Sequence, residues 1–292
     1  MSPQCDQPNT RTGSSTPGGS LTIGGDMVVG RLGYGAMRLC GPGVWGEPRD
    51  PEGAGKVLHR VVELGVTFID TSDAYGPEVN EQFIAETLHP YPEGLVVATK
   101  GGLLRPRREA WDRDGRPEHL RVACAGSLRR LRVERIDLYQ LHAPDPRVPF
   151  EDSVGTLAEL RSEGKIRHIG LSNVSVDQLR KARRIAPIVS VQNRYNIADR
   201  SSEDVLAECT REGIAFLPWY PLEAGGSAGG KGALARVAAR HQATPAQIAI
   251  AWLLARSPVV LPIPGTSSIA HLEENVAAAG IQLSPADLAE LS

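Results

Sequence analysis

The stretch Thr67-Phe68-Ile69-Asp70-Thr71-Ser72-Asp73-Ala74-Tyr75-Gly76 decides the fold that this sequence predicts. The mostly apolar run from Val66 to Ile69 follows a glycine and ends abruptly in an acid, which is typical of a strand buried on both faces. Strands of that kind belong to parallel sheets covered by helices. Asp70 is therefore expected at the carboxyl end of a strand, the edge at which barrel enzymes carry their chemistry.

Three later predicted strands also end in polar residues. The strand at 95–99 is followed by Lys100, the strand at 136–141 by His142, and the strand at 166–171 by Ser172 and Asn173. Because the carboxyl ends of parallel strands share one edge of the sheet, these side chains are expected to meet Asp70 and Tyr75 in one site.

Strand-like and helix-like segments alternate along the rest of the chain. Further strands are predicted around Tyr34 and over residues 188–192, 214–219 and 259–263. Helical periodicity is found over residues 53–64, 80–88, 117–131, 150–163, 175–185, 203–212, 233–240, 245–255, 269–278 and 285–291. Eight such strands alternating with helices predict an α/β fold of the (β/α)8 TIM-barrel type. A β-hairpin over residues 21–29 and extra C-terminal helices complete it.

A doubly wound open sheet is the alternative fold. It would carry an early GxGxxG turn between the first strand and helix, whereas Gly33-Tyr34-Gly35 is followed by neither a third glycine nor a helix start. The barrel is therefore favoured. Residues 1–18 are rich in Ser, Pro, Gly and Thr and are predicted to form a disordered tail, which leaves residues 19–292 as one domain.

Composition excludes several classes of protein. The net charge of -2 favours neither nucleic acid nor an anionic membrane as a partner. No apolar run approaches the roughly 18 residues of a membrane span, and no hydrophobic signal core precedes the domain, so a cytoplasmic enzyme is expected. The cysteines lack ligand spacing and are predicted to be free thiols; they are Cys5, Cys40, Cys124 and Cys209. No metal site is expected, because His142 is the only histidine at a strand exit.

The four residue types expected at the strand exits suit acid–base chemistry on a carbonyl group. A phenol titrates near ~10, too high for an efficient acid at neutral pH, and the ammonium of Lys100 would lower the pKa of Tyr75. Asp70 would hold Lys100 in a buried ion pair, while His142 would orient a carbonyl oxygen. Taken singly, each residue has another interpretation as a cap, a packing residue or a solvated loop residue. Their shared position favours catalysis.

The segments 68–76, 98–102 and 139–142 resemble the catalytic tetrad of the aldo-keto reductases, and the likeness runs from about Gly33 to the C-terminus. The resemblance implies an NAD(P)H-dependent oxidoreductase that reduces an aldehyde or ketone to an alcohol by hydride transfer. It implies that Asp70, Tyr75, Lys100 and His142 are catalytic, with Tyr75 as the general acid. Its substrate would be a small carbonyl compound, and the chain is similar to bacterial members that include pyridoxal reductases.

The resemblance also implies a cofactor site across the top of the barrel. Its residues would be Gly35, Ala36, Met37, Asp70, Ser172, Asn173, Gln192, Trp219, Tyr220, Pro221, Leu222, Gly265, Thr266, Ser267, Ser268, His271, Glu274 and Asn275. Trp219 would stack on the nicotinamide, and a glycine-rich loop at 225–230 would cover the pyrophosphate. Many relatives carry Arg or Lys near Ser267, Ser268 or His271 to bind the 2'-phosphate of NADPH. NADPH is expected, with NADH as an alternative because this chain lacks those cations.

Substrate selection is expected from the loops at 41–48 and 101–116, through Trp45 and Trp111. Arg105, Arg107 and Arg108 are predicted either to face solvent or, if they face the pocket, to favour an anionic carbonyl compound. Two other functions stay open: a dinucleotide-binding regulatory or scaffold barrel with little turnover, and a lyase or isomerase that forms a Schiff base on Lys100. No oligomeric state is predicted.

Overall fold

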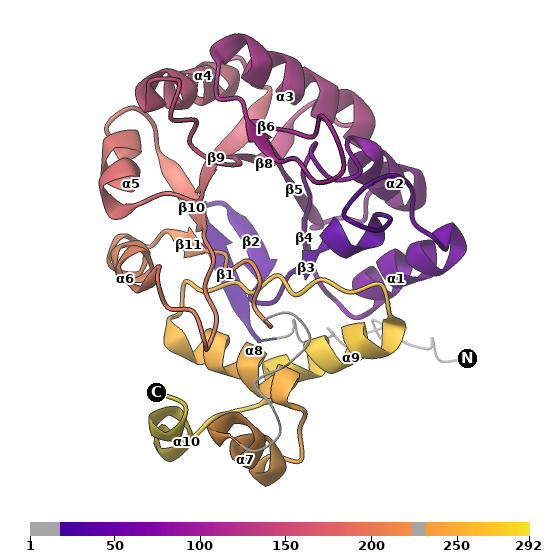
Figure 1. Cartoon of the computed structure of the whole chain (residues 1–292), viewed down its shortest axis with the longest axis vertical. Coiled ribbons are helices and arrows are strands. Elements are labelled where there is room, and N and C mark those ends of the chain that lie inside the picture. Colours follow the sequence, from indigo (N-terminus) through magenta and orange to yellow (C-terminus); the bar gives the residue numbers. More distant parts are fainter. Residues whose placement is uncertain (1–17, 223–231) are drawn as a thin grey trace, which may run out of the picture.

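The computed structural model describes residues 18–222 and 232–292. The predicted tail at residues 1–18 therefore lies outside the described residues, apart from Gly18, and so does the glycine-rich loop at 225–230. A ring of helices surrounds a curled parallel sheet, as Figure 1 shows from one end of the barrel. The prediction of a TIM-barrel fold is confirmed.

Seven strands form the sheet, and each pairs in parallel with its neighbours. In spatial order they are β3 (Tyr34–Gly35), β4 (Phe68–Asp70), β5 (Val96–Gly101), β8 (Ile136–Leu141), β9 (Ile166–Ser172), β10 (Ile188–Gln192) and β11 (Ala215–Phe216). The register pairs Gly35 with Asp70 and Lys100 with Gln140. The polar strand exits therefore lie at one edge, as the sequence indicates.

The segment at 259–264 closes the barrel between β11 and β3. Leu261 N donates to Phe216 O at 2.9 Å, and on the other side Gly33 N donates to Pro262 O at 2.9 Å. The predicted eighth strand is nevertheless not a regular strand, because Pro262 and Pro264 have no N–H for a continuous ladder. A Cβ added to Gly265 would lie 2.6 Å from Gly35 O, so this closure requires a glycine.

The helices follow the predicted positions within two residues at either end. They are α1 (Pro51–Glu63), α2 (Val79–Leu88), α3 (Pro117–Leu131), α4 (Phe150–Ser162), α5 (Val176–Arg183), α6 (Glu203–Glu212), α7 (Ala233–Arg240), α8 (Pro245–Arg256), α9 (Ile269–Ala277) and α10 (Pro285–Glu290). Residues that cap the helix N-termini explain this agreement. Asp50 accepts from Gly53 N, and Ser175 and Thr244 form capping boxes. A 3₁₀ turn over Ala36–Leu39 follows β3.

The N-terminal hairpin closes the floor of the barrel. Its strands are β1 (Ser20–Ile23) and β2 (Met27–Gly30), which pair antiparallel and are visible through the ring in Figure 1. Ile23 and Met27 pack with Phe68 and Leu138 in the apolar core inside the barrel. Burial of this hairpin keeps water from entering the barrel at the end opposite the polar strand exits.

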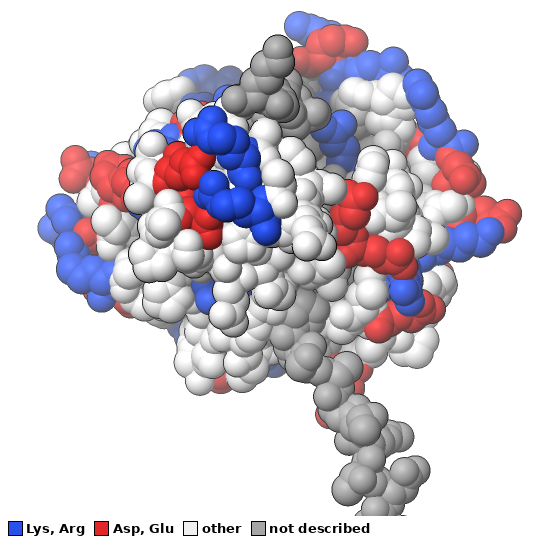
Figure 2. All heavy atoms as spheres, turned by 90° about the horizontal axis from the view of Figure 1, so that it is seen from below, with Lys and Arg blue, Asp and Glu red and all other residues white. Residues whose placement is uncertain are grey.

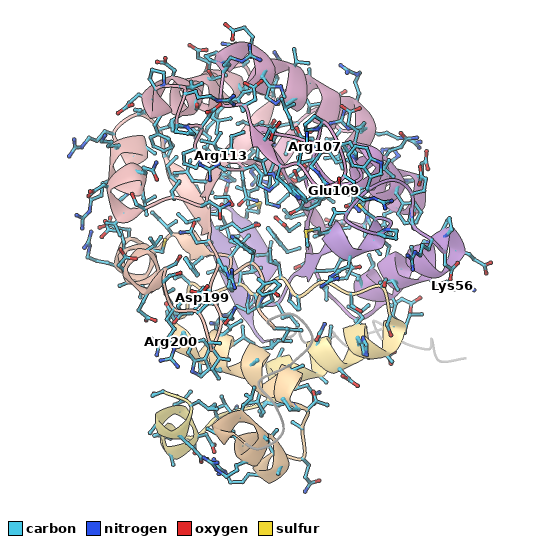
Figure 3. All side chains as sticks on the ribbon, viewed as in Figure 1. Lys56, Arg107, Glu109, Arg113, Asp199 and Arg200 are labelled. Carbon is cyan, nitrogen blue, oxygen red and sulfur yellow. The ribbon has the colours of Figure 1, made fainter. Side chains whose placement is uncertain are left out.

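The long loop after β5 contains a second, unpredicted hairpin. Its strands β6 (Leu103–Leu104) and β7 (Asp112–Arg113) pair antiparallel. Strands of two residues are too short to show periodicity, which explains why the sequence indicates only a loop. Figure 3 shows Arg107, Glu109 and Arg113 on this loop, inside the outline of the helical ring.

The extra helices α7 and α10 pack together outside the ring (Figure 1). Arg236 and Arg240 of α7 pair with Glu290 at 2.7 Å, and Arg240 also pairs with Asp287. Figure 2 shows acidic and basic side chains interspersed on the face that includes this end of the molecule. In the described ranges, none of the helices is long and apolar enough to cross a membrane.

Candidate active site

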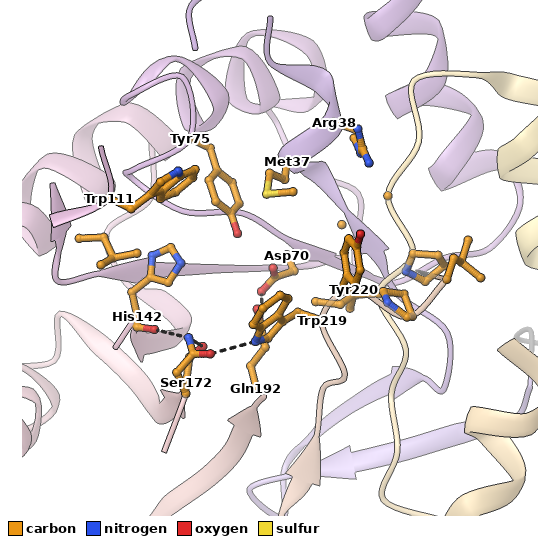
Figure 4. A pocket seen from close by; sticks show the side chains of 18 residues that line it. Met37, Arg38, Asp70, Tyr75, Trp111, His142, Ser172, Gln192, Trp219 and Tyr220 are labelled. Carbon is orange, nitrogen blue, oxygen red and sulfur yellow. Dashed lines mark hydrogen bonds between the residues drawn. The ribbon is translucent and has the colours of Figure 1, made fainter. Parts of the chain in front are cut away.

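A cavity of about 480 Å³ opens at the carboxyl ends of the strands (Figure 4). It is lined by residues from the strand exits and from three loops: Gly35, Met37, Arg38, Asp70, Tyr75, Leu103, Trp111, His142, Ser172, Asn173, Gln192, Trp219, Tyr220, Pro221, Leu222, Ile263, Pro264 and Gly265. Three of the four predicted catalytic residues line it directly. The fourth, Lys100, lies behind them.

Lys100 and Asp70 form a buried ion pair. Lys100 Nζ lies 2.6 Å from Asp70 Oδ2 and also donates to Thr71 O at 2.9 Å. Gln140 and Gln192 donate to the other carboxylate oxygen, at 3.2 and 2.8 Å. Burial lowers the pKa of Lys100, but Asp70 and Tyr75 more than offset burial, so the pKa lies above its ordinary value. Lys100 is thus a fixed cation, and because it does not line the cavity, its position counts against a Schiff base with substrate.

The hydroxyl group of Tyr75 points into the cavity above Asp70 (Figure 4). Lys100 Nζ donates to Tyr75 Oη at 3.4 Å. Burial raises the pKa of this phenol; Lys100 lowers it, as the sequence analysis expected, but it does not outweigh burial and the nearby Asp70. The net shift of this pKa is upward, in contrast to the expected lowering. Tyr75 is a protonated phenol beside a fixed cation.

His142 stands edge-on to Tyr75, with ring centroids 5.9 Å apart. Its Nδ1 lies 3.0 Å from Ser72 Oγ, which leaves Nε2 as the ring nitrogen that can meet a substrate. Burial, and then the charge of Lys100, hold the pKa of His142 well below its usual range. The imidazole is therefore neutral and can donate one hydrogen bond or accept one, but carries no positive charge.

Asn173 connects His142 to Trp219. Its Nδ2 donates to His142 O at 3.0 Å, and its Oδ1 accepts from Trp219 Nε1 at 3.0 Å. The backbone of Asn173 is left-handed, with φ at 59°, a conformation that asparagine tolerates better than most residues. The amide therefore fixes the indole of Trp219 at the mouth of the cavity, next to Tyr220.

The structure separates the predicted cofactor residues into two groups. Those that line the cavity are Gly35, Met37, Asp70, Ser172, Asn173, Gln192, Trp219, Tyr220, Pro221, Leu222 and Gly265. Ala36 does not line it; this residue is fully buried, and its carbonyl accepts from Asn80 Nδ2. The cavity is lined mainly by apolar and aromatic side chains, together with the amides of Asn173 and Gln192.

The remaining predicted cofactor residues do not line this cavity and lie just before α9 or within it. Ser268 caps α9 by accepting from His271 N, and Thr266 Oγ1 accepts from Ser268 N at 3.0 Å. Ser267 lines a second cavity of about 460 Å³, together with Arg38 and Arg49. His271 and Glu274 are exposed, whereas Asn275 is buried.

The arginines of the 101–116 loop do not line the active-site cavity. The guanidinium group of Arg105 lies 3.7 Å from the centroid of Trp111 and 5.5 Å from that of Trp45. It donates to the carbonyl groups of Gly43 and Val44. Trp45, which the sequence predicts to take part in substrate selection, does not line the cavity either. Arg107 and Arg108 are exposed, so these arginines give no support for an anionic substrate.

Four further residues contact or line the site without being predicted from the sequence. Gln140 of β8 lies two positions before His142, which directly follows that strand. Alternation along a strand puts such residues on one face, and this spacing could have identified Gln140. Ser72 lies within the quoted stretch, but its contact with His142 follows from the turn after β4. Arg38 follows Met37 directly, and Leu103 belongs to the short hairpin.

Comparisons with known proteins agree with this geometry. The model of the aldo/keto reductase family matches residues 31–292. The chain belongs to the aldo/keto reductase family. It is 51% identical to an uncharacterized oxidoreductase of Schizosaccharomyces pombe over 91% of this chain and 87% of that protein. It is 45% identical to the pyridoxine 4-dehydrogenase of Escherichia coli, over 91% of this chain and 95% of that enzyme.

A solved aldo/keto reductase from Klebsiella pneumoniae, crystallised with NADP and acetate, has a TM-score of 0.78. It is 26% identical and covers 93% of both chains. Membership of the family makes this aldo/keto reductase an NAD(P)H-dependent enzyme that acts on small carbonyl compounds. In the ranges that the structure describes, no group of His, Cys, Asp or Glu side chains could hold a metal ion.

Proposed function

We propose that this aldo/keto reductase reduces a flat aromatic or heteroaromatic aldehyde, of the pyridoxal type, to its alcohol with NADPH. The observation that carries the proposal is the convergence of Tyr75, His142 and the Asp70–Lys100 pair on one cavity with aromatic walls. When bound, the reduced nicotinamide supplies the hydride.

Tyr75 is proposed to donate the proton to the carbonyl oxygen. Its Oη is the only phenol oxygen of the cavity that Lys100 contacts, and the phenolate left after proton transfer would lie beside that ammonium at 3.4 Å. The charge of Lys100 is already present and already oriented by Asp70, so no reorganisation is needed as the negative charge develops. A high pKa keeps the phenol protonated before the reaction, and the adjacent cation eases loss of the proton during it.

His142 is proposed to orient the carbonyl group. The neutral ring presents Nε2 to the cavity, and the perpendicular arrangement with Tyr75 lets two donors approach one oxygen from different directions. Gln192 and Asn173, at the ends of β10 and β9, would bind the carboxamide of the nicotinamide, and Trp219 would cover the ring. Apolar walls from Leu103 and Trp111 would exclude water from the reacting atoms.

The preference for a substrate of the pyridoxal type rests on two supports. Trp111 lies edge-on to Tyr75, with ring centroids 6.4 Å apart, and so offers an aromatic wall at the reacting end of the cavity. The relative that is 45% identical over nearly its whole length is a pyridoxine 4-dehydrogenase. A flat ring bearing an aldehyde would fill such a slot with its oxygen toward Tyr75.

The preference for NADPH is proposed to come from Arg38. This exposed residue borders both the active-site cavity and the second cavity that Ser267 lines. Its Cγ lies 3.4 Å from the position of a Cβ on Gly265, two residues before Ser267. Arg38 would supply the cation that the helix start itself lacks, with Ser267 and Ser268 as additional donors to a phosphate.

A carbonyl screen tests this function. The full chain is supplied with NADPH or NADH and a panel of pyridoxal, benzaldehyde, an aliphatic aldehyde and an anionic keto acid, and loss of the reduced cofactor is followed by absorbance. The expected order of kcat/KM is pyridoxal and benzaldehyde above the other two, with NADPH preferred. Tight cofactor binding without turnover of any carbonyl would instead favour the regulatory barrel.

A further inference from the structure

A hydrogen-bonded chain leads from His142 away from the cavity. Ser72 Oγ lies 3.0 Å from His142 Nδ1 and 3.1 Å from Asp73 Oδ1. Ser72 is inaccessible to solvent, and Asp73 and His142 are each 8% exposed. A buried carboxyl group is thus connected to the site imidazole through a single hydroxyl group. The mechanism proposed above makes no use of Ser72 or Asp73.

The hydrogens of this chain can be counted. Ser72 Oγ accepts from Ala74 N at 3.1 Å and has one hydrogen to donate. Its possible acceptors are His142 Nδ1, Asp73 Oδ1 and the backbone oxygen of Lys100, the last at a longer 3.4 Å. A serine that donates to Asp73 must accept from His142 Nδ1–H, which leaves Nε2 without a proton. A serine that donates to His142 Nδ1 leaves the proton on Nε2, facing the cavity.

The charged groups near Asp73 determine which of these two hydrogen-bond arrangements is favoured. Glu81 of α2 is fully buried nearby, and its carboxylate is held by Thr99 and by Arg130 of α3, whose Nε lies 2.7 Å away. Burial raises the pKa of Asp73 well above its usual range, and the charge of Glu81 raises it further. Arg130 and the hydrogen bonds from Ser72 and from Ala74 N lower it, but offset only part of this. Tyr139 of β8 also faces Asp73, and the ammonium of Lys100 is already paired with Asp70. The Asp73 carboxyl group is therefore expected to be protonated.

We propose that Asp73, acting through Ser72, sets which nitrogen of His142 carries the proton that faces the substrate. A protonated Asp73 donates to Ser72, Ser72 donates to His142 Nδ1, and the proton on Nε2 can then be donated to a carbonyl oxygen. An ionised Asp73 reverses both bonds and turns Nε2 into an acceptor, which repels that oxygen. Ser72 and Asp73 are positioning residues for His142, and this role rests on the proposed function of the site.

The simpler view is that Ser72 only caps the turn by accepting from Ala74 N. Such a cap would affect stability but not the tautomer of the ring, so the two views differ in a spectroscopic signature. The ring-nitrogen signals of His142 can be read by NMR on the full chain labelled with ¹⁵N-histidine and assigned by their loss in His142→Gln. This readout needs neither cofactor nor turnover.

The first experiment compares Ser72→Ala with Ser190→Ala, a control at another fully buried serine whose hydroxyl has no hydrogen-bond partner among the described residues. In the wild type and in Ser190→Ala, Nε2 is expected to carry the proton. In Ser72→Ala a mixture of tautomers is expected, with kcat/KM for the carbonyl lowered roughly tenfold or more and cofactor affinity retained. An unchanged tautomer and an unchanged kcat/KM in Ser72→Ala would overturn the proposal.

The second experiment uses Asp73→Asn, whose amide can always donate to Ser72. In the wild type, kcat/KM is expected to fall as pH rises through the raised pKa of Asp73; in Asp73→Asn that fall should vanish while Nε2 stays protonated. A variant with the wild-type pH profile would contradict the coupling even if its activity were lower. The acid role of Tyr75 and the control of the His142 tautomer are tested independently. Full activity of Tyr75→Phe would refute the acid role of Tyr75, but it would not affect the measurement of the tautomer.

Discussion

The ammonium group of Lys100 lies 2.6 Å from the carboxylate of Asp70, and the side chains of the two residues are 0% and 3% exposed. Two further donors, Gln140 and Gln192, bind the same carboxylate. Removing either charge from such a pair leaves the other buried without compensation. The pair thus links the stability of the barrel to the electrostatics of its active site.

Replacement of Lys100 by Met should destabilise the protein strongly. The free energy of unfolding is expected to fall by about 3–5 kcal/mol, because Asp70 would stay buried without its counter-charge. Chemical denaturation of the full chain measures this. The matched control is Lys56→Met, at an exposed lysine that pairs with Glu52 on α1 and is labelled in Figure 3. Equal stability of the two variants would show that the buried pair contributes nothing.

The low pKa of His142 predicts a loss of stability in mild acid. The folded ring stays neutral, whereas the unfolded ring takes up a proton near pH ~6.5, so the stabilising contribution of His142 is present above that pH and is lost as pH falls. The free energy of unfolding should drop by about 1.4 kcal/mol for each pH unit below the unfolded pKa. Denaturation curves of the wild type and His142→Gln between pH 7 and pH 5 isolate the contribution of His142. The same pH dependence of the free energy of unfolding in both proteins would contradict it.

Arg105 should control substrate binding without touching substrate. It lies on Trp111 and donates to the carbonyl groups of Gly43 and Val44, so it holds two loops together at the rim of the cavity. Arg105→Met is expected to raise KM for the carbonyl about tenfold and to change kcat little, since Tyr75 is unaffected. Arg105→Lys, which keeps the charge but not the planar fork, should recover only part of the loss. An unchanged KM in Arg105→Met would refute this role.

Arg38 should distinguish the two cofactors. Arg38→Ala is expected to weaken binding of NADPH by roughly tenfold, the effect of one charge-assisted bond to phosphate, while binding of NADH stays within twofold. Isothermal titration of both cofactors into the wild type, Arg38→Ala and Arg38→Lys measures this. An equal loss for NADPH and NADH would place the arginine at a phosphate that the two cofactors share.

The sequence predicts the barrel and the strand exits well, because buried parallel strands are rich in apolar residues and a charged or titratable residue marks where each one ends. Asp70, Lys100 and His142 each stand at such an end. Periodicity cannot reveal the irregular closing segment at 259–264, whose prolines interrupt the ladder, or the hairpin of β6 and β7, whose strands contain two residues each.

Tertiary contacts also cannot be predicted from a single sequence. Arg105 is a surface-type residue in a polar loop, and only its packing between Trp45 and Trp111 makes it a buried organiser of that loop. The pKa of Tyr75 could be argued from Lys100 alone, but the opposing effect of burial depends on how many atoms surround the phenol. The Ser72 contact with His142 likewise depends on the turn after β4.

The acid role of Tyr75 is tested most directly by single-turnover kinetics of Tyr75→Phe. The enzyme is loaded with NADPH, mixed with an aromatic aldehyde, and followed by the loss of cofactor absorbance, with cofactor affinity measured in parallel. The phenylalanine keeps the ring and removes only the hydroxyl group, so cofactor affinity should stay within about twofold while the rate of hydride transfer falls by roughly 100-fold or more. A variant that reduces the aldehyde at the wild-type rate would contradict the account.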